Sequence, residues 1–382
     1  MNLIKIEEAF HLNREQVKEF HKNYLNAGFA GMLKLLNLDK IFVQAAGVSV
    51  WDTEGKEYLD FLGGFGALNL GHNHPAVLAA LEKVRGMPSL IQSSLGIPAA
   101  ALAHNLAQIT PGSLQRTFFC NSGCEAVEGA LKLARAATGR KEFIYCHNSF
   151  HGKSFGALSV TGRGKYQRPF EPLLPGCTAV PFGDAGALAY ELKKGKAAAF
   201  IVEPIQGEGG INLPPAGYLA QAAKLCRQHG ALLIVDEIQT GFGRTGTMFA
   251  CEQEGTVPDV LCLAKSLGGG VMPIGAFITT DEIWKKAYGG MEKALLHTST
   301  FGGNAWAAAA GIAAIQVLTE ENLPAAAKEK GDYFLERLRG LKERFPLVKD
   351  VRGRGLLIGL EFNQPGGLAA RLSGGLTDKL AG

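Results

Sequence analysis

The chain has 382 residues, of which 47% are hydrophobic and 19% charged, and this composition predicts a globular protein of two domains. The formal net charge of +4 is small for this length, so neither nucleic acid nor an anionic membrane is an expected partner. Seven scattered cysteines, with no C-x-x-C pair and no His/Cys cluster, argue against a disulfide framework and a metal site and favour a cytoplasmic setting. The N-terminal residues do not resemble a secretory signal, so none is expected, and the sequence contains no uncharged apolar run near the roughly 18 residues that span a bilayer.

The first part of the chain predicts helix followed by a small β-meander. Residues 3–38 carry apolar side chains at the helical period, and residues 41–64 alternate short strands with turn residues. A helix then begins near Pro75, because proline fits the first turn of a helix, and runs to about Val84.

From residue 99 onward, helices alternate with apolar strands. This order predicts an α/β fold with a largely parallel sheet and helices on both faces. The strands are expected at 116–120, 141–146, 177–180, 198–203, 231–236, 260–264 and 274–279. The helices are expected at 99–109, 123–137, 184–194, 215–229, 304–318 and 323–343, and a strand pair at 348–362.

Two of these strands end in a charged side chain. The apolar run Ala231 to Val235 ends in Asp236, and the run 260–264 ends in Lys265. Open α/β sheets place their ligands at the carboxyl ends of the strands. A pyridoxal phosphate (PLP) site needs this pair, because the lysine can form a Schiff base and the acid can keep the pyridine nitrogen protonated. An ordinary strand end with a solvated acid and lysine gives the same pattern, so the remaining segments must decide.

Two segments could complete such a site. Ser122 and Gly123 stand where a helix begins after a strand, and the free amides and positive dipole of that helix end would seat a phosphate. A simple capping box formed by Ser122 with Glu125 is the alternative. Phe150 and His151 follow the next strand, where an aromatic ring could stack on a flat heterocycle or serve only in packing.

Two further segments carry polar groups near glycines. Glu203 and Glu208 lie in a glycine-rich loop after a strand, and Glu208 could point into the cleft or remain an exposed loop acid. Thr300 belongs to a hydroxyl-rich segment before the helix at 304–318, where it could reach an anion.

Six segments in this order resemble the class III (ω-) aminotransferases, PLP enzymes of fold type I. The resemblance covers about residues 40–362 and rests on NSGCEA, FHGK, EPIQGEGG, IVDEIQTGFGRTG, LAKSLGGGVMPIG and TSTFGGN. Within the family the chain is most similar to putrescine aminotransferases, through stretches such as YLDFLGGFGALNLGH and LHTSTFGGNAWAAAAGIAAIQVLTEENLPA.

The resemblance implies a role for each residue at the cofactor ring. Lys265 matches the lysine that holds PLP and moves the proton, and Asp236 matches the acid facing the pyridine nitrogen. Gln239 matches the residue near the ring hydroxyl. Phe150 matches the stacking aromatic, with His151 beside it among the cofactor-binding residues.

The resemblance also implies how phosphate and substrate are bound. Ser122 and Gly123 match the phosphate seat, with Cys124 where many relatives have threonine. Thr300 from the partner subunit completes that seat, which implies a homodimer with active sites at the interface; pairing of dimers into a tetramer stays open. Glu208 matches a glutamate that pairs with an arginine when the amine donor lacks an α-carboxylate, and Glu203 is grouped with it as a substrate residue.

The implied architecture is a large domain with a mostly parallel mixed sheet and a smaller α+β domain. We expect residues 1–50 to start the small domain, 51–290 to form the large PLP-binding domain, 291–322 to connect the two, and 323–382 to end the small domain. The family's carboxylate-binding arginine lies beyond the residues present, since Arg352 and Arg354 do not match it. We therefore expect a small domain that lacks on the order of several tens of residues.

The expected reaction moves an amino group from a terminal amine, putrescine or a similar diamine, to 2-oxoglutarate by a ping-pong route. Ornithine, acetylornithine or 4-aminobutyrate are alternative donors. A racemase, aminomutase or decarboxylating relative on the same scaffold, and a PLP-binding chain that is inactive without the arginine segment, are the other two alternatives.

Overall fold

The computed structural model describes residues 3–88, 90–91 and 93–363, and the chain divides into two compact units at residues 61 and 62. The first unit confirms the predicted helical region and meander. Its elements are α1 (Ile6–Ala9), α2 (Arg14–Tyr24), α3 (Ala27–Leu35), β1 (Phe42–Ala46), β2 (Ser49–Asp52) and β3 (Glu57–Leu59), with the strands antiparallel in the order β1-β2-β3. Asn13 and Asn26 cap α2 and α3, and so the helical stretch is broken into three pieces.

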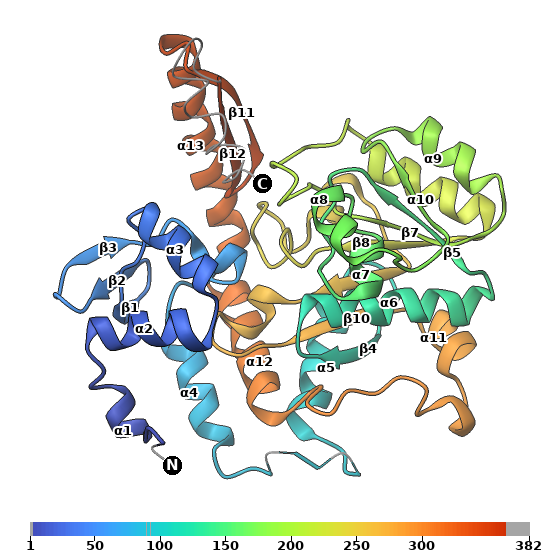
Figure 1. Cartoon of the computed structure of the whole chain (residues 1–382). Coiled ribbons are helices and arrows are strands. Elements are labelled where there is room, and N and C mark those ends of the chain that lie inside the picture. The colour runs from blue at the N-terminus through green and yellow to red at the C-terminus, as the bar shows by residue number, and fades with distance from the viewer. Residues whose placement is uncertain (1–2, 89, 92, 364–382) are drawn as a thin grey trace. The chain divides into compact units, whose positions relative to one another are not determined.

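The second unit is built on a seven-stranded sheet in the order β4-β10-β9-β8-β7-β5-β6 (Figure 1). All neighbouring pairs are parallel except those of β10, which runs antiparallel to both β4 and β9. The strands are β4 (Arg116–Cys120), β5 (Glu142–Cys146), β6 (Cys177–Val180), β7 (Ala197–Val202), β8 (Leu232–Asp236), β9 (Val260–Leu263) and β10 (Gly275–Thr279). The predicted α/β fold with a mostly parallel mixed sheet is confirmed.

Helices cover both faces of this sheet. The helices of this unit are α4 (Pro75–Val84), α5 (Ile97–Ile109), α6 (Gly123–Thr138), α7 (Phe155–Ser159), α8 (Gly164–Gln167), α9 (Ala185–Leu192), α10 (Tyr218–His229), α11 (Asp281–Tyr288), α12 (Ala305–Glu320) and α13 (Leu323–Arg344). One face is packed by α5, α9, α10 and α12 and the other by α6. Short 3₁₀ turns are η1 (Gly63–Gly66), η2 (Arg168–Phe170), η3 (Ala250–Glu254), η4 (Lys265–Gly268) and η5 (Met291–Lys293). The helices α7, α8 and α11 are not among those expected from the sequence.

The core lies in two layers, one on each face of the sheet. Because β7 is buried on both faces, its alternate residues divide between them: Phe200 and Val202 pack with α5, α9, α10 and α12, while Ala199 and Ile201 pack with α6. Because every side chain within this strand is apolar and buried, a functional polar residue can lie only beyond its end.

After the sheet, α13 packs against the antiparallel pair β11 (Val348–Arg354) and β12 (Leu357–Phe362), which confirms the predicted strand pair. The four-part domain division stays a prediction, and the part of its last segment that follows residue 363 lies outside the described residues. No helix in the described part of the chain is long and apolar enough to cross a membrane.

Candidate active site

Three neighbouring parallel strands end at one cavity. Glu203 directly follows β7, Asp236 ends β8, and Lys265 begins η4 just after β9. The cavity has a volume of about 560 Å³ and is lined by all three, so the paired strand ends meet as the sequence predicts. Of the other expected site residues, Ser122, Gly123, Cys124, Phe150, His151, Glu208 and Gln239 also line it.

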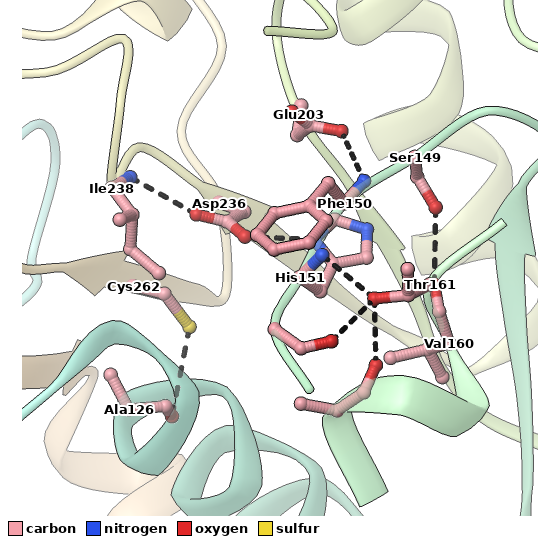
Figure 2. Close-up of polar contacts among 12 residues, drawn as sticks. Ala126, Ser149, Phe150, His151, Val160, Thr161, Glu203, Asp236, Ile238 and Cys262 are labelled. Carbon is pink, nitrogen blue, oxygen red and sulfur yellow. Dashed lines mark hydrogen bonds and ion pairs between the residues drawn. The ribbon is translucent and has the colours of Figure 1, made fainter. Parts of the chain in front are cut away.

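Asp236 is held in one orientation by two hydrogen bonds. One carboxylate oxygen lies 2.7 Å from Nδ1 of His151, and the other accepts the backbone N–H of Ile238 at 3.0 Å (Figure 2). Both side chains are buried, and Nε2 of His151 has no partner among the described residues. His151 therefore helps to fix the orientation of the Asp236 carboxyl at the cavity wall.

Lys265 is held in an unusual backbone conformation, with φ of 50° at the start of η4. Burial lowers the pKa of its amine, and Arg244 acts in the same direction, while the carboxylates of Asp236, Glu208 and Glu203 oppose the shift. At neutral pH a lysine with a lowered pKa is more often in its neutral form, which is the form that acts as a nucleophile and as a base.

Glu203 holds two backbone segments of the site through its carboxylate. It is buried, and its two carboxylate oxygens accept the backbone N–H groups of Phe150 at 3.0 Å and Gly207 at 3.1 Å. Burial raises the pKa of Glu203 to about 7. Its bonds fix the aromatic residue and the glycine-rich loop, and its expected substrate role stays a prediction.

Gln239 reaches the cavity between two glycines. A Cβ on Gly207 would lie 1.5 Å from Oε1 of Gln239, and one on Gly66 would lie 3.3 Å from its Cγ. The amide also donates to the carbonyl of Phe65 at 3.2 Å. The two glycines therefore make the space that this side chain occupies.

The first turn of α6 faces the same cavity. The Ser122 hydroxyl accepts the N–H of Glu125 at 3.2 Å, while the Glu125 carboxylate accepts the N–H of Asn121 rather than that of Ser122. The amides of Gly123 and Cys124 have no carbonyl partner within the helix. These free amides and the positive end of the 16-residue helix therefore face the cavity, where they favour the binding of a phosphate.

Thr300 is the one predicted site residue that the structure does not bring to this cavity. It is exposed and lines a second cavity of about 690 Å³, together with Thr298 and Ser299. The two cavities are linked, because Asn121, which lines the first, donates to Oγ of Ser299 at 3.1 Å.

The site geometry agrees with the comparison to known proteins. The sequence model of the class-III aminotransferases matches residues 36–377. The chain belongs to this family. It is a PLP-dependent transaminase.

Solved structures of other aminotransferases share the fold closely. The ornithine aminotransferase of Toxoplasma gondii ME49 has 35% sequence identity and a TM-score of 0.86, over 94% of this chain and 86% of that chain. The acetylornithine aminotransferase of Elizabethkingia anophelis has 33% identity and a TM-score of 0.76, over 92% and 85%. An amine transaminase of an uncultivated Pseudomonas species in its PLP-bound form has 31% identity and a TM-score of 0.80, over 90% and 86%.

The cavity of this class-III aminotransferase fits PLP by its own chemistry. An anion seat at α6, an aromatic ring, a fixed carboxylate and a lysine with a lowered pKa line one space of about 560 Å³. The buried Asp236 carboxylate has the charge that a protonated ring nitrogen requires.

Two features of the site were not predicted. Lys153 lines the cavity, with its ammonium 4.3 Å from the Tyr166 ring centroid; its place in the FHGK motif was the available signal. Arg244 donates to Oδ1 of Asn69, and Asn69 donates to the carbonyl of Phe242 at 2.8 Å. This contact between distant segments has no periodic pattern that could reveal it.

Proposed function

We propose that this aminotransferase moves an amino group from a terminal amine, putrescine or a similar diamine, to 2-oxoglutarate. The observation that supports a diamine is Glu208, the exposed carboxylate among the three acids of the cavity. Asp236 and Glu203 are buried with their oxygens engaged, whereas Glu208 can meet the second ammonium of a donor. The resemblance of the sequence to putrescine aminotransferases supports the same donor.

Bound PLP supplies a carbonyl that captures the amine and a ring that accepts the electron pair left when the substrate carbon loses its proton. Ser122, Gly123 and Cys124 would hold its phosphate, and Phe150 would lie against its ring. Asp236, fixed by His151 and Ile238, would keep the ring nitrogen protonated, and Gln239 would contact the ring hydroxyl.

Lys265 is the catalytic base in this proposal. Its Nζ would first hold the cofactor and then, once free, take the proton from the substrate carbon and return it to the cofactor carbon. The lowered pKa makes the neutral amine available, and the nearby acids stabilise the ammonium that forms.

Ornithine or acetylornithine is the second candidate donor class, because solved relatives carry those names. Such a donor has an α-carboxylate, and Lys153 is a cation on the cavity wall, with its ammonium over the Tyr166 ring. Lys153 could bind that group, so the donor must be decided by assay.

We propose a cytoplasmic homodimer whose active sites lie at the interface. The second cavity carries exposed apolar side chains such as Leu95, Ile97 and Leu295 beside Thr300. A surface of this kind is typical of a subunit interface. In such a dimer, Thr300 would reach the phosphate seat of the partner subunit.

Glutamate formation from 2-oxoglutarate tests the proposed reaction, with putrescine, ornithine, acetylornithine and 4-aminobutyrate compared as donors. We expect kcat/KM for putrescine to exceed kcat/KM for each of the other donors by about tenfold or more. This is the effect expected of one charge contact between the enzyme and its donor. A faster reaction with ornithine or 4-aminobutyrate would refute the diamine assignment.

The same assays separate the other two alternatives. Stereochemical inversion or CO₂ release without glutamate formation would indicate another reaction on this scaffold. Bound PLP without any turnover would indicate an inactive chain.

A further inference from the structure

The loop at residues 203–212, which carries Glu208, is held from several sides. Within the loop, Gly207 donates to Glu203, and Asn212 donates to the carbonyl of Gln206 at 3.1 Å. From outside, Arg163 donates to the Glu208 carbonyl, and Arg352 of β11 donates to the carbonyls of Gly210 and Ile211. The C-terminal strand pair thus touches the segment that presents Glu208 to the cavity.

The Arg352 guanidinium binds loop carbonyls with one edge and carboxylates of the strand pair with the other. Its Nε lies 3.1 Å from the carbonyl oxygens of both Gly210 and Ile211, and Nη2 also donates to Gly210. Its Nη1 donates to Asp350 at 3.0 Å and to Glu361 at 2.7 Å, on β11 and β12. The two carboxylates fix the planar fork and balance its charge, which leaves its other edge for the loop.

The turn that Arg352 binds has a backbone conformation that needs support. Ile211 is β-branched yet has φ of 54°, and Gly210 before it has φ of 115°. On β12, Gly359 makes room for this turn, since a Cβ there would lie 3.1 Å from Cβ of Ile211. Without external contacts, such a turn would relax toward commoner backbone angles, and Glu208 lies only two residues before Gly210.

We propose that Arg352 is a positioning residue that fixes the Gly210–Ile211 turn and thereby the place of Glu208 in the substrate cavity. This inference rests on the proposed function for the pairing of Glu208 with the donor ammonium. It assigns the β11–β12 pair a part in donor recognition, although none of its residues lines the cavity. Lys265 and Asp236 are outside this set of contacts, so the chemical step itself does not depend on it.

Arg354 offers a matched control. It is the other arginine of β11, and its guanidinium donates to Oε1 of Gln253 at 3.0 Å rather than to a loop carbonyl. Arg354→Gln removes the same charge from the same strand. An effect found for Arg352→Gln and absent from Arg354→Gln therefore does not come from the mere loss of a positive charge on β11.

Hydrogen exchange tests the hold on the loop without any turnover. The amides of Gly210, Ile211 and Asn212 donate to carbonyls within the loop, and we expect Arg352→Gln to speed their exchange about tenfold or more. Arg352→Lys should give a smaller increase, and Arg354→Gln none. Unchanged exchange in Arg352→Gln would overturn the proposal, whatever the enzyme's substrate proves to be.

Kinetics then test the connection to Glu208. With putrescine, or with the amine that does react, Arg352→Gln should raise KM about tenfold while kcat changes less than about twofold. In a Glu208→Gln background the same substitution should add nothing further, because its effect passes through Glu208. A full additional KM increase in that background, or an equal effect of Arg354→Gln, would contradict the proposal. A failure of all amines would reject the proposed function and leave the exchange result to decide Arg352.

Discussion

At the scale of single residues, the site depends on buried charges that are held by few partners. The side chains of His151 and Asp236 are 0% and 4% exposed, and Nδ1 of His151 lies 2.7 Å from Oδ2 of Asp236. Removing His151 leaves the buried Asp236 carboxyl with only the Ile238 amide as a hydrogen-bond partner among the described residues, which is far more costly than losing a surface ion pair.

We therefore predict that His151→Ala lowers the free energy of unfolding by about 3 to 5 kcal/mol, even in protein without cofactor. Urea unfolding of the apoprotein measures this loss. His104→Ala, at an exposed position of α5, is the control and should change stability by less than about 0.5 kcal/mol. A loss in His151→Ala no larger than in the control would show that the pair does not hold Asp236.

The raised pKa of Glu203 determines how the free energy of unfolding changes with pH. Burial raises its pKa from 4.5 to about 7, so between these values the folded protein binds more protons than the unfolded chain. Stability therefore falls as pH rises from 4.5 to 7, by about 3 kcal/mol at about 1.4 kcal/mol per pH unit. Glu203→Gln should remove this part of the pH slope.

Unfolding measured at intervals between pH 4.5 and 7 checks the Glu203 prediction. The difference in unfolding free energy between the wild type and Glu203→Gln should change steadily across this range. Glu336→Gln, an exposed position on α13, should leave the slope unchanged. If the wild type and Glu203→Gln show parallel pH profiles, Glu203 titrates at its ordinary pKa.

At the scale of elements, α13 shows how two glycines in one helix serve different purposes. A Cβ on Gly331 would lie 2.1 Å from the carbonyl oxygen of Gly355, between β11 and β12, so glycine is needed there for close packing. A Cβ on Gly340 would meet nothing within 4 Å. The first glycine is a packing requirement and the second only weakens the helix.

Gly331→Ala should therefore destabilise the protein by about 1 to 3 kcal/mol through overpacking, and Gly340→Ala should stabilise it by about 0.5 to 1 kcal/mol. Thermal unfolding of the two variants beside the wild type measures both changes. Shifts of the same sign would mean that the packing of α13 against the strand pair differs from this structure.

Sequence reasoning worked best where a pattern is local. Apolar runs and helical periods predicted the sheet strands and the long helices, and charges at strand ends predicted the meeting of Asp236 with Lys265. Short helices such as α7 and α8 span too few residues to show a period. The contacts of His151 with Asp236, of Glu203 with Phe150, and of Arg352 with Gly210 join distant segments, so only the fold reveals them.

At the scale of the whole molecule, the proposed dimer can be tested by subunit complementation. Each site would take Lys265 from one chain and Thr300 from the other. Dimers of Lys265→Ala chains should be nearly inactive. Dimers of Thr300→Ala chains should have weakened activity. When they are mixed and reassociated, the hybrid dimers should hold one intact site, which restores about one quarter of the wild-type activity. Activity no greater than the mean of the two parents would place Thr300 in its own subunit or outside the site.

The most direct test of the account concerns the lysine that holds the cofactor. Borohydride reduction of the PLP-loaded protein, followed by peptide mass spectrometry, identifies the side chain bonded to PLP. Because Lys265 lies in the cavity with Asp236 and has a lowered pKa, we predict that the pyridoxyl group is found on the peptide containing Lys265. Labelling of Lys153, the other lysine of the cavity, or of no cavity lysine, would contradict the account.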